Sequence, residues 1–179
     1  ILFSINLKSQ AWQNFPEDIS DEDKLYIMST IEEYVQTAGK ALENDSINYS
    51  KRQFELICQL IAEWTFHKTI DIIHAEIPVQ YRDGLLQKIA FTIFEITKQV
   101  YEKDYNEDDI LNAVEYHVNN AYKSSLEQLL NKNVISQDLY NNALAHSSID
   151  EMFNNKNKSH DEFYSIEKNI DNKYLNDKV

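Results

Sequence analysis

Acidic and histidine residues spaced along one predicted helix are the strongest candidates for chemistry in this sequence. Glu63, His67 and His74 follow one another at intervals of four and seven, which places them on one helical face. Asp71 and His74 are three residues apart and form a second acid–histidine pair on an adjacent strip. Carboxylate and imidazole groups bind divalent transition metals, so a metal site made of these four residues is one hypothesis.

The spacing also limits this hypothesis. His67 and His74 would lie roughly 10 Å apart along a helix axis, too far to share one ion, although Glu63 and His67 could share one. Di-iron bundles use Glu-x-x-His motifs, and none occurs here, while Glu115 and His117 point to different sides of a later helix. The sequence therefore favours His67 and His74 as residues at the edge of an apolar stripe that bind no cofactor. A site for a divalent transition metal is the alternative.

Other catalytic motifs are missing. There is no Gly-x-Ser-x-Gly nucleophile elbow, and Gly39 and Gly84 alone cannot form a phosphate-cradling loop. The acidic runs 21–23 and 107–109 could bind magnesium, but they stand at predicted helix starts, where opposition to the helix dipole already explains them. No catalytic residue is assigned, and no motif identifies a family.

The single cysteine excludes an internal disulfide and a cysteine-based zinc cluster. Cys58 lies among Phe54, Ile57 and Ile61, a setting typical of a buried, inert thiol rather than a nucleophile.

The elements that position these residues are predicted to be helices almost throughout. The chain has two glycines and two prolines in 179 residues, where average usage would give roughly 13 and 9. A sheet protein of this size needs many tight turns, and those turns normally need glycine. We therefore predict an all-α fold, an antiparallel bundle of four long helices with one or two shorter C-terminal helices.

Capping residues and apolar periodicity give the helix boundaries. Ser20 and Asn106 are predicted N-caps, each followed by three acids, and Ser50 with Gln53 forms a capping box. Pro78 marks a break or a kink, and Ser136 caps a shorter helix. The predicted long helices cover about 21–44, 51–76 and 79–102, and a fourth that begins after Asn106.

Apolar stripes predict the buried face of each helix. The second helix carries two such stripes and is expected to be central in the bundle. The residues expected to face inward are Met28, Ile31, Val35, Ala38 and Leu42 in the first helix; Phe54, Ile57, Ile61, Trp64, Leu56, Leu60, Ile70 and Ile77 on the second; Leu85, Leu86, Ile89, Ile93, Ile96 and Val100 in the third; and Leu111, Val114, Val118, Ala121, Tyr122 and Leu129 in the fourth.

The C-terminal segment carries a further helical pattern. Ser159 and Glu162 form a capping box, and Phe163, Ile166, Ile170 and Tyr174 fall on one face. We predict three segments: an N-terminal extension over 1–19, a helical bundle domain over 20–153, and a polar connection with an amphipathic helix over 154–179.

Charge and exposed aromatic residues indicate the partners. Thirty acidic residues against seventeen basic ones give a net charge of −13, which disfavours nucleic acid and anionic membrane. The charge permits a basic protein partner, although an acidic surface that only maintains solubility is the commoner explanation. Phe91, on a polar helix side, and the stripe of Phe163, Ile166, Ile170 and Tyr174 are the predicted contact surfaces.

No apolar run approaches the ~20 residues that span a bilayer. The opening residues 1–7 are too short for a signal-peptide core with its flanks, and a cytoplasmic location is expected.

These observations favour a non-enzymatic, acidic protein-interaction module, such as an adaptor, an escort chaperone or an immunity-type inhibitor. Two alternatives stay open: a metal-dependent bundle enzyme that uses the acid–histidine cluster, and a structural subunit that forms a homo-oligomer through its terminal helix.

Overall fold

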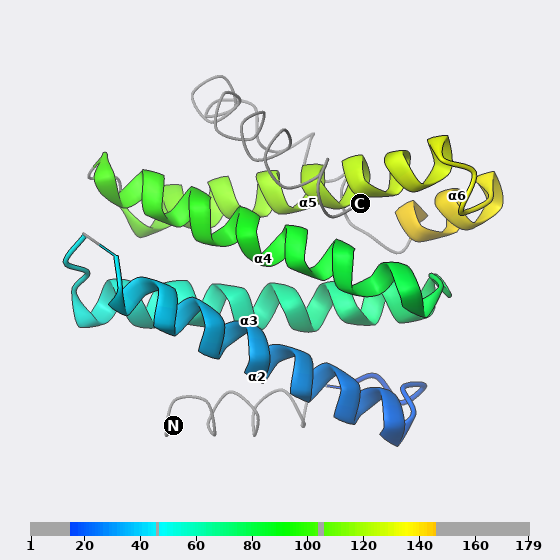
Figure 1. Ribbon diagram of the computed structural model, residues 1–179, viewed down its shortest axis with the longest axis horizontal. Helices are drawn as coiled ribbons and strands as arrows, with labels where there is room; N and C mark the ends of the chain where they lie inside the picture. Colours follow the sequence, from blue (N-terminus) through cyan, green and yellow to red (C-terminus); the bar gives the residue numbers. More distant parts are fainter. Residues whose placement is uncertain (1–14, 46, 104–105, 146–179) are drawn as a thin grey trace. The chain divides into compact units, whose positions relative to one another are not determined.

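The computed structural model describes residues 15–45, 47–103 and 106–145, and within these ranges all regular structure is helical (Figure 1). The long helices are α2 (Asp21–Glu43), α3 (Lys51–His74), α4 (Val79–Glu102) and α5 (Glu107–Asn131), and the short one is α6 (Gln137–Ala145). The predicted all-α fold with four long helices and a shorter one after them is confirmed for this part of the chain. The helix predicted within 154–179 lies outside the described residues.

The contacts of the chain divide it into two compact units, Ile1–Ile70 and Asp71–Val179. The boundary falls inside α3, so the first unit contains α2 and most of α3, and the second contains the last turn of α3 with α4, α5 and α6. This division leaves the predicted segments 1–19, 20–153 and 154–179 as predictions.

The helices begin where the sequence placed their caps. The hydroxyl of Ser20 accepts the backbone N–H of Asp23 at 3.1 Å, and the side-chain oxygen of Asn106 accepts that of Asp109 at 2.9 Å. Each cap satisfies one of the backbone donors that the first helical turn leaves without an intrahelical partner. The acids that follow each cap oppose the positive end of the helix dipole.

The predicted capping box at the start of α3 is also present. The N–H of Gln53 donates to the Ser50 hydroxyl at 3.1 Å, and the N–H of Ser50 donates to the Gln53 side chain at 2.9 Å. The Ser136 hydroxyl accepts the N–H of Leu139 at 3.1 Å and so opens α6.

Helix α3 ends two residues earlier than predicted, because the chain enters the left-handed region at Glu76, with φ 58°. The N–H of Ile77 donates to the Ile72 carbonyl at 3.2 Å, and the N–H of Glu76 donates to the Ile73 carbonyl at 3.0 Å. This pair of bonds is a Schellman motif. Asn133, also with φ 58°, ends α5 in the same way.

Replacing Glu76 with glycine is expected to raise the free energy of unfolding by about 1 kcal/mol, because a side chain with a Cβ is strained at positive φ. The matched change Asn133→Gly should raise the free energy of unfolding by less, since asparagine tolerates this conformation better than glutamate does. Urea denaturation of both variants measures the difference. A loss of stability in Glu76→Gly would contradict this assignment of strain.

In the first unit, α2 contacts α3 where Gly39 faces Phe54. A Cβ at Gly39 would lie 3.5 Å from Cζ of Phe54, an ordinary van der Waals distance, so this contact does not require glycine. The rings of Phe15 and Phe66 have centroids 5.2 Å apart and join the segment before α2 to α3. The predicted α2 stripe is buried throughout.

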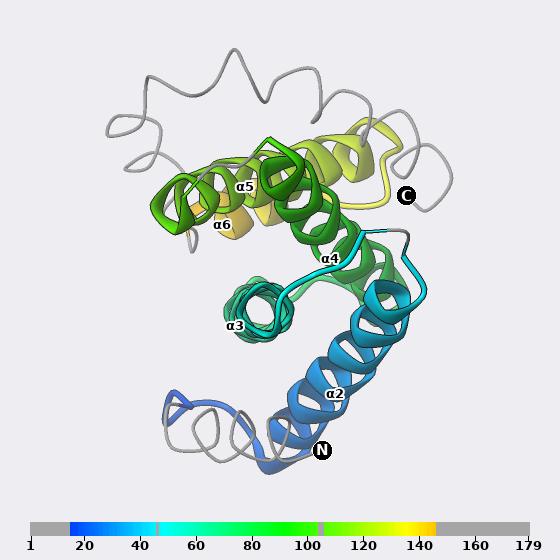
Figure 2. The same cartoon turned by 90° about the vertical axis from the view of Figure 1, so that its left-hand side faces the viewer.

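In the second unit, α4 and α5 run antiparallel and lie side by side in both views (Figures 1 and 2). The six predicted core residues of α4 are all buried, as are five of the six predicted for α5. α6 packs on α5, where the Tyr140 hydroxyl donates to Glu127 Oε1 at 3.3 Å.

The exception in α5 is Leu111, which was predicted to face inward and is 43% exposed. Ile110 is buried instead. The residues three and four positions after Ile110 are the buried Ala113 and Val114, whereas Leu111 is followed at these spacings by Val114 and the half-buried Glu115, so Leu111 lies at the margin of the stripe. The prediction for Leu111 is wrong.

Candidate functional site

The first pair of predicted metal ligands lies on the surface of α3. Glu63 and His67 are both exposed. The Gln59 side-chain amide donates to Glu63 Oε1 at 3.2 Å, and the His67 ring meets the neighbouring Phe66 ring edge-on, with centroids 5.3 Å apart.

The second pair lies in the last turn of α3. Asp71 and His74 are both half-buried. His74 is the last residue of α3. Nowhere in the described ranges do three or more His, Cys, Asp or Glu side chains gather in a way that could hold a metal ion. The predicted ligand set stays a prediction.

Exposure makes the first pair easy to test. Replacing His67 with alanine should change the free energy of unfolding by no more than about 0.5 kcal/mol, as is usual for a surface position without a special role. Thermal melts with and without added manganese should also coincide. A metal bound through His67 would give a manganese-dependent rise in the melting temperature that the variant loses.

Asp71 lies close enough to Tyr122 for its charge to act on the phenol, a pairing that the sequence did not predict. Tyr122, in the middle of α5, is fully buried, and both residues belong to the second unit. Burial raises the pKa of the Tyr122 phenol far above its ordinary value, and the negative charge of Asp71 raises it further. The phenol is therefore neutral at every physiological pH and cannot act there as a base or nucleophile.

Other polar side chains in the second unit are buried along α4 and α5. The Thr92 hydroxyl donates to the Lys88 carbonyl at 2.7 Å, and Ser125 donates to the Ala121 carbonyl at 2.7 Å. Bonds of this kind satisfy a buried hydroxyl within its own helix and indicate structural roles. His117 is fully buried, with its ring edge-on to the adjacent Tyr116 ring at a centroid distance of 5.0 Å.

Cys58 is buried, as predicted, at 2% exposure. Burial raises the pKa of its thiol from 9.0 to about 11. The thiolate that a nucleophile or a metal ligand requires is therefore scarce at neutral pH, which supports the interpretation of an inert thiol.

Of the predicted contact residues, Phe91 lies half-buried on α4, and its role in a contact surface stays a prediction. Phe163, Ile166, Ile170 and Tyr174 lie outside the described residues, and the surface they were predicted to form stays a prediction.

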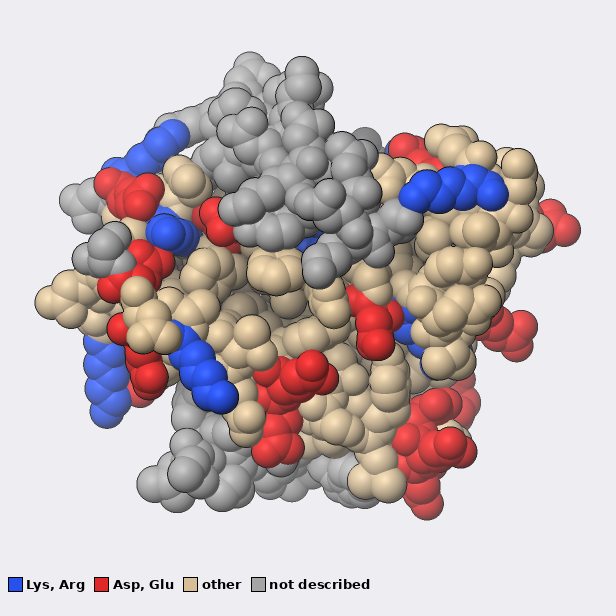
Figure 3. Space-filling model, in the orientation of Figure 1, with Lys and Arg blue, Asp and Glu red and all other residues tan. Residues whose placement is uncertain are grey.

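Acidic side chains gather at the start of α2, at the lower right of Figure 3. Glu17, Asp18, Asp21 and Glu22 are all exposed there, and Leu25, one helical turn further on, is 64% exposed. We call these five residues the α2 acidic patch. Asp21 and Glu22 precede Leu25 by four and three residues, so they share its helical face. The patch therefore offers an apolar contact bordered by negative charge.

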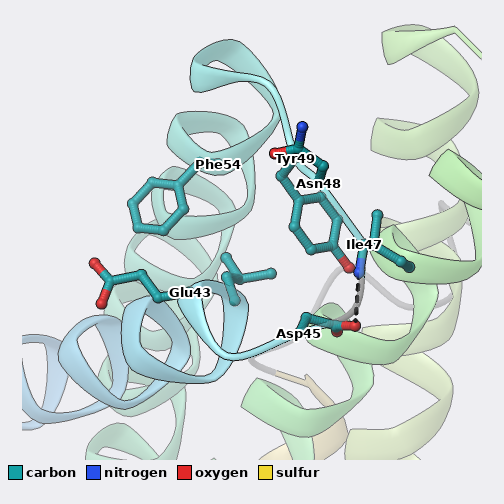
Figure 4. A pocket seen from close by; sticks show the side chains of 7 residues that line it. Glu43, Asp45, Ile47, Asn48, Tyr49 and Phe54 are labelled. Carbon is teal, nitrogen blue, oxygen red and sulfur yellow. Dashed lines mark hydrogen bonds between the residues drawn. The ribbon is translucent and has the colours of Figure 1, made fainter.

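A cavity of about 290 Å³ lies in the same unit, where α2 connects to α3. Two aromatic rings and two carboxylates line it together with smaller side chains (Figure 4); the lining residues are Leu42, Glu43, Asp45, Ile47, Asn48, Tyr49 and Phe54. Figure 4 shows Phe54 and Glu43 on one side and Tyr49 and Asp45 on the other. We call this space the α2–α3 cavity.

Comparison with known proteins adds no family: no family model, curated protein or solved structure matches this chain. Within the described ranges, no helix combines the length and the apolar character needed to cross a bilayer.

Proposed function

We propose that this protein is a non-enzymatic interaction module that binds a basic protein partner through the α2 acidic patch. The observation that carries the proposal is the placement of charge. Every carboxylate among the described residues is exposed or half-buried, whereas Lys68 and Lys88 are buried, at 3% and 1% exposure. Burial removes part of an already small basic complement from the surface, so the surface is more acidic than the sequence count implies.

The composition of the α2 acidic patch supports a binding role over solubility alone. A surface that only maintains solubility carries scattered charges and few exposed large apolar side chains. Here Leu25 is strongly exposed beside Asp21 and Glu22. An apolar centre with a charged border is the usual composition of a protein-binding surface.

Lys24, a neighbour of the patch, forms an ion pair with one of its carboxylates. Lys24 Nζ lies 3.7 Å from Asp21 Oδ1, and the Asp21 side chain stays 92% exposed. A pair with so exposed a carboxylate contributes little to stability, so a basic partner could compete for Asp21. The proposal covers adaptors, escort chaperones and immunity-type inhibitors alike.

A charge-neutralised variant tests the proposal. The protein is immobilised and exposed at low salt to an extract of its source cells, in wild-type form and as Glu17→Gln/Asp18→Asn/Asp21→Asn/Glu22→Gln. We expect a specific basic protein on the wild type and its loss from the patch variant, because four attractive charges are removed.

The chain offers a matched control elsewhere. The variant Glu33→Gln/Glu63→Gln/Glu102→Gln/Asp138→Asn also loses four exposed acids, none of them in the α2 acidic patch, and Asp138 lies in the first turn of α6. It should retain the partner. Equal loss from both variants would show that net charge rather than the α2 acidic patch governs binding. Equal retention by both would show that the patch carboxylates do not contribute, and either result contradicts the proposal.

A further inference from the structure

We infer that the α2–α3 cavity binds one arginine or lysine side chain of the partner, an inference that rests on the proposed function. The cavity lies in the same unit as the α2 acidic patch, at the opposite end of α2. A partner that spans this helix would gain a specific contact there, in addition to the charges and the leucine of the patch.

The size of the cavity suits a single side chain. Its volume of about 290 Å³ stands at the lower limit of pockets for whole small molecules, which hold about 300–1,000 Å³. An arginine or lysine side chain, with its alkyl stem and charged head, fits within such a volume. A nucleotide or another large cofactor does not.

The lining favours a cation over other occupants. Phe54 and Tyr49 present aromatic rings, whose faces attract ammonium and guanidinium groups. Glu43 and Asp45 add carboxylates, and none of the lining residues is basic. The apolar stem of an arginine or lysine would contact Leu42 and Ile47, as such stems do at protein surfaces. An anion would be repelled, and a neutral apolar group would desolvate the carboxylates without pairing them.

The Asp45 carboxylate is held in position by the backbone. Its Oδ1 accepts the N–H of Ile47 at 3.2 Å, a bond drawn in Figure 4. The Asp45 side chain is half-buried, so its charge is less screened by water than that of the exposed Glu43. We therefore expect Asp45 to contribute more than Glu43 to binding of the cation.

Capped amino acids provide a direct test. Nα-acetyl-arginine methylamide and Nα-acetyl-lysine methylamide are titrated into the ¹⁵N-labelled full chain, beside their neutral counterparts made from citrulline and Nε-acetyl-lysine. We expect saturable shifts of the Ile47, Asn48 and Tyr49 amides with at least one charged compound and much weaker shifts with its neutral counterpart. No saturable shift, or equal shifts with charged and neutral compounds, would overturn the inference.

Variants locate the site. Asp45→Asn keeps the side-chain oxygen that accepts the Ile47 N–H and removes the charge, and it should weaken binding about tenfold, as expected for a charge-assisted hydrogen bond. Glu33→Gln removes an exposed α2 charge outside the cavity and should leave binding within twofold. Equal affinity of Asp45→Asn and Glu33→Gln would place the cation elsewhere and overturn the inference.

The two proposals fail separately. If the wild type captures a basic partner and Asp45→Asn captures it equally well, the α2–α3 cavity is not part of the interface, and the proposed function stands. If the charged amino acids bind in the cavity and no partner is captured, the proposed function fails, and the α2–α3 cavity is a site for a cationic group of another origin.

Discussion

Replacing Tyr122 with alanine is expected to lower the free energy of unfolding by about 4 kcal/mol. Tyr122 lies in α5 and is the bulkiest fully buried side chain in the part of the chain that the structure describes. Truncating a buried aromatic ring removes its transfer free energy and leaves a cavity, which together cost about 3–5 kcal/mol. Urea denaturation monitored by circular dichroism measures the loss.

Tyr122→Phe is the matched control for this prediction. It keeps the ring and removes only the hydroxyl, so its cost should stay below about 1.5 kcal/mol. Equal destabilisation by the two variants would show that the hydroxyl, rather than the packed ring, stabilises this part of the second unit. A loss below about 1 kcal/mol for Tyr122→Ala would contradict the buried position itself.

Alkaline pH is expected to destabilise the protein through Cys58. Burial raises the pKa of the Cys58 thiol from 9.0 to about 11. The folded state retains the thiol proton over this range, whereas the unfolded state loses it. The contribution of Cys58 to the free energy of unfolding is therefore fully present below pH 9 and is lost as the pH rises to 11. At about 1.4 kcal/mol per pKa unit, the loss is about 2–3 kcal/mol.

The measurement is the free energy of unfolding at pH 8, 9, 10 and 11 in the presence of a reductant. Cys58→Ala should have a lower stability at pH 8 and a shallower decline above pH 9. Burial and the charge of Asp71 raise the pKa of Tyr122, so this residue also lowers the free energy of unfolding above pH 10. The variant Tyr122→Phe removes the contribution of Tyr122 to the decline. If the free energy of unfolding declined equally with pH in the wild type and in Cys58→Ala, the raised pKa of the buried Cys58 thiol would be contradicted.

Helix starts were the most predictable feature of this chain, because their causes are local. Ser20 and Ser50 lie within three residues of the N–H groups that they satisfy, so sequence spacing alone identifies them. Helix ends were less predictable. The left-handed residues are Glu76 and Asn133, and neither glycine has a positive φ. Glycine placement, the usual guide to helix ends, was therefore uninformative here.

Residues brought together from different helices were not predictable. The proximity of Asp71 to Tyr122 depends on how α3 and α5 are rotated about their axes, and a stripe of apolar residues defines that rotation only to within a broad arc. The α2–α3 cavity depends on the path of the connection between two helices, which the polar sequence around Asp45 and Tyr49 does not specify.

The affinity of a captured basic partner for the wild-type protein and for the patch variant tests the central claim most directly. Exposed ion pairs contribute about 0.2–1 kcal/mol each, so removing the four carboxylates of the α2 acidic patch should raise the dissociation constant roughly tenfold or more at low salt. The matched four-acid control should stay within about twofold. Recovery of no specific basic protein by the wild type, or equal dissociation constants for the two variants, would contradict the proposal that the α2 acidic patch is a binding surface.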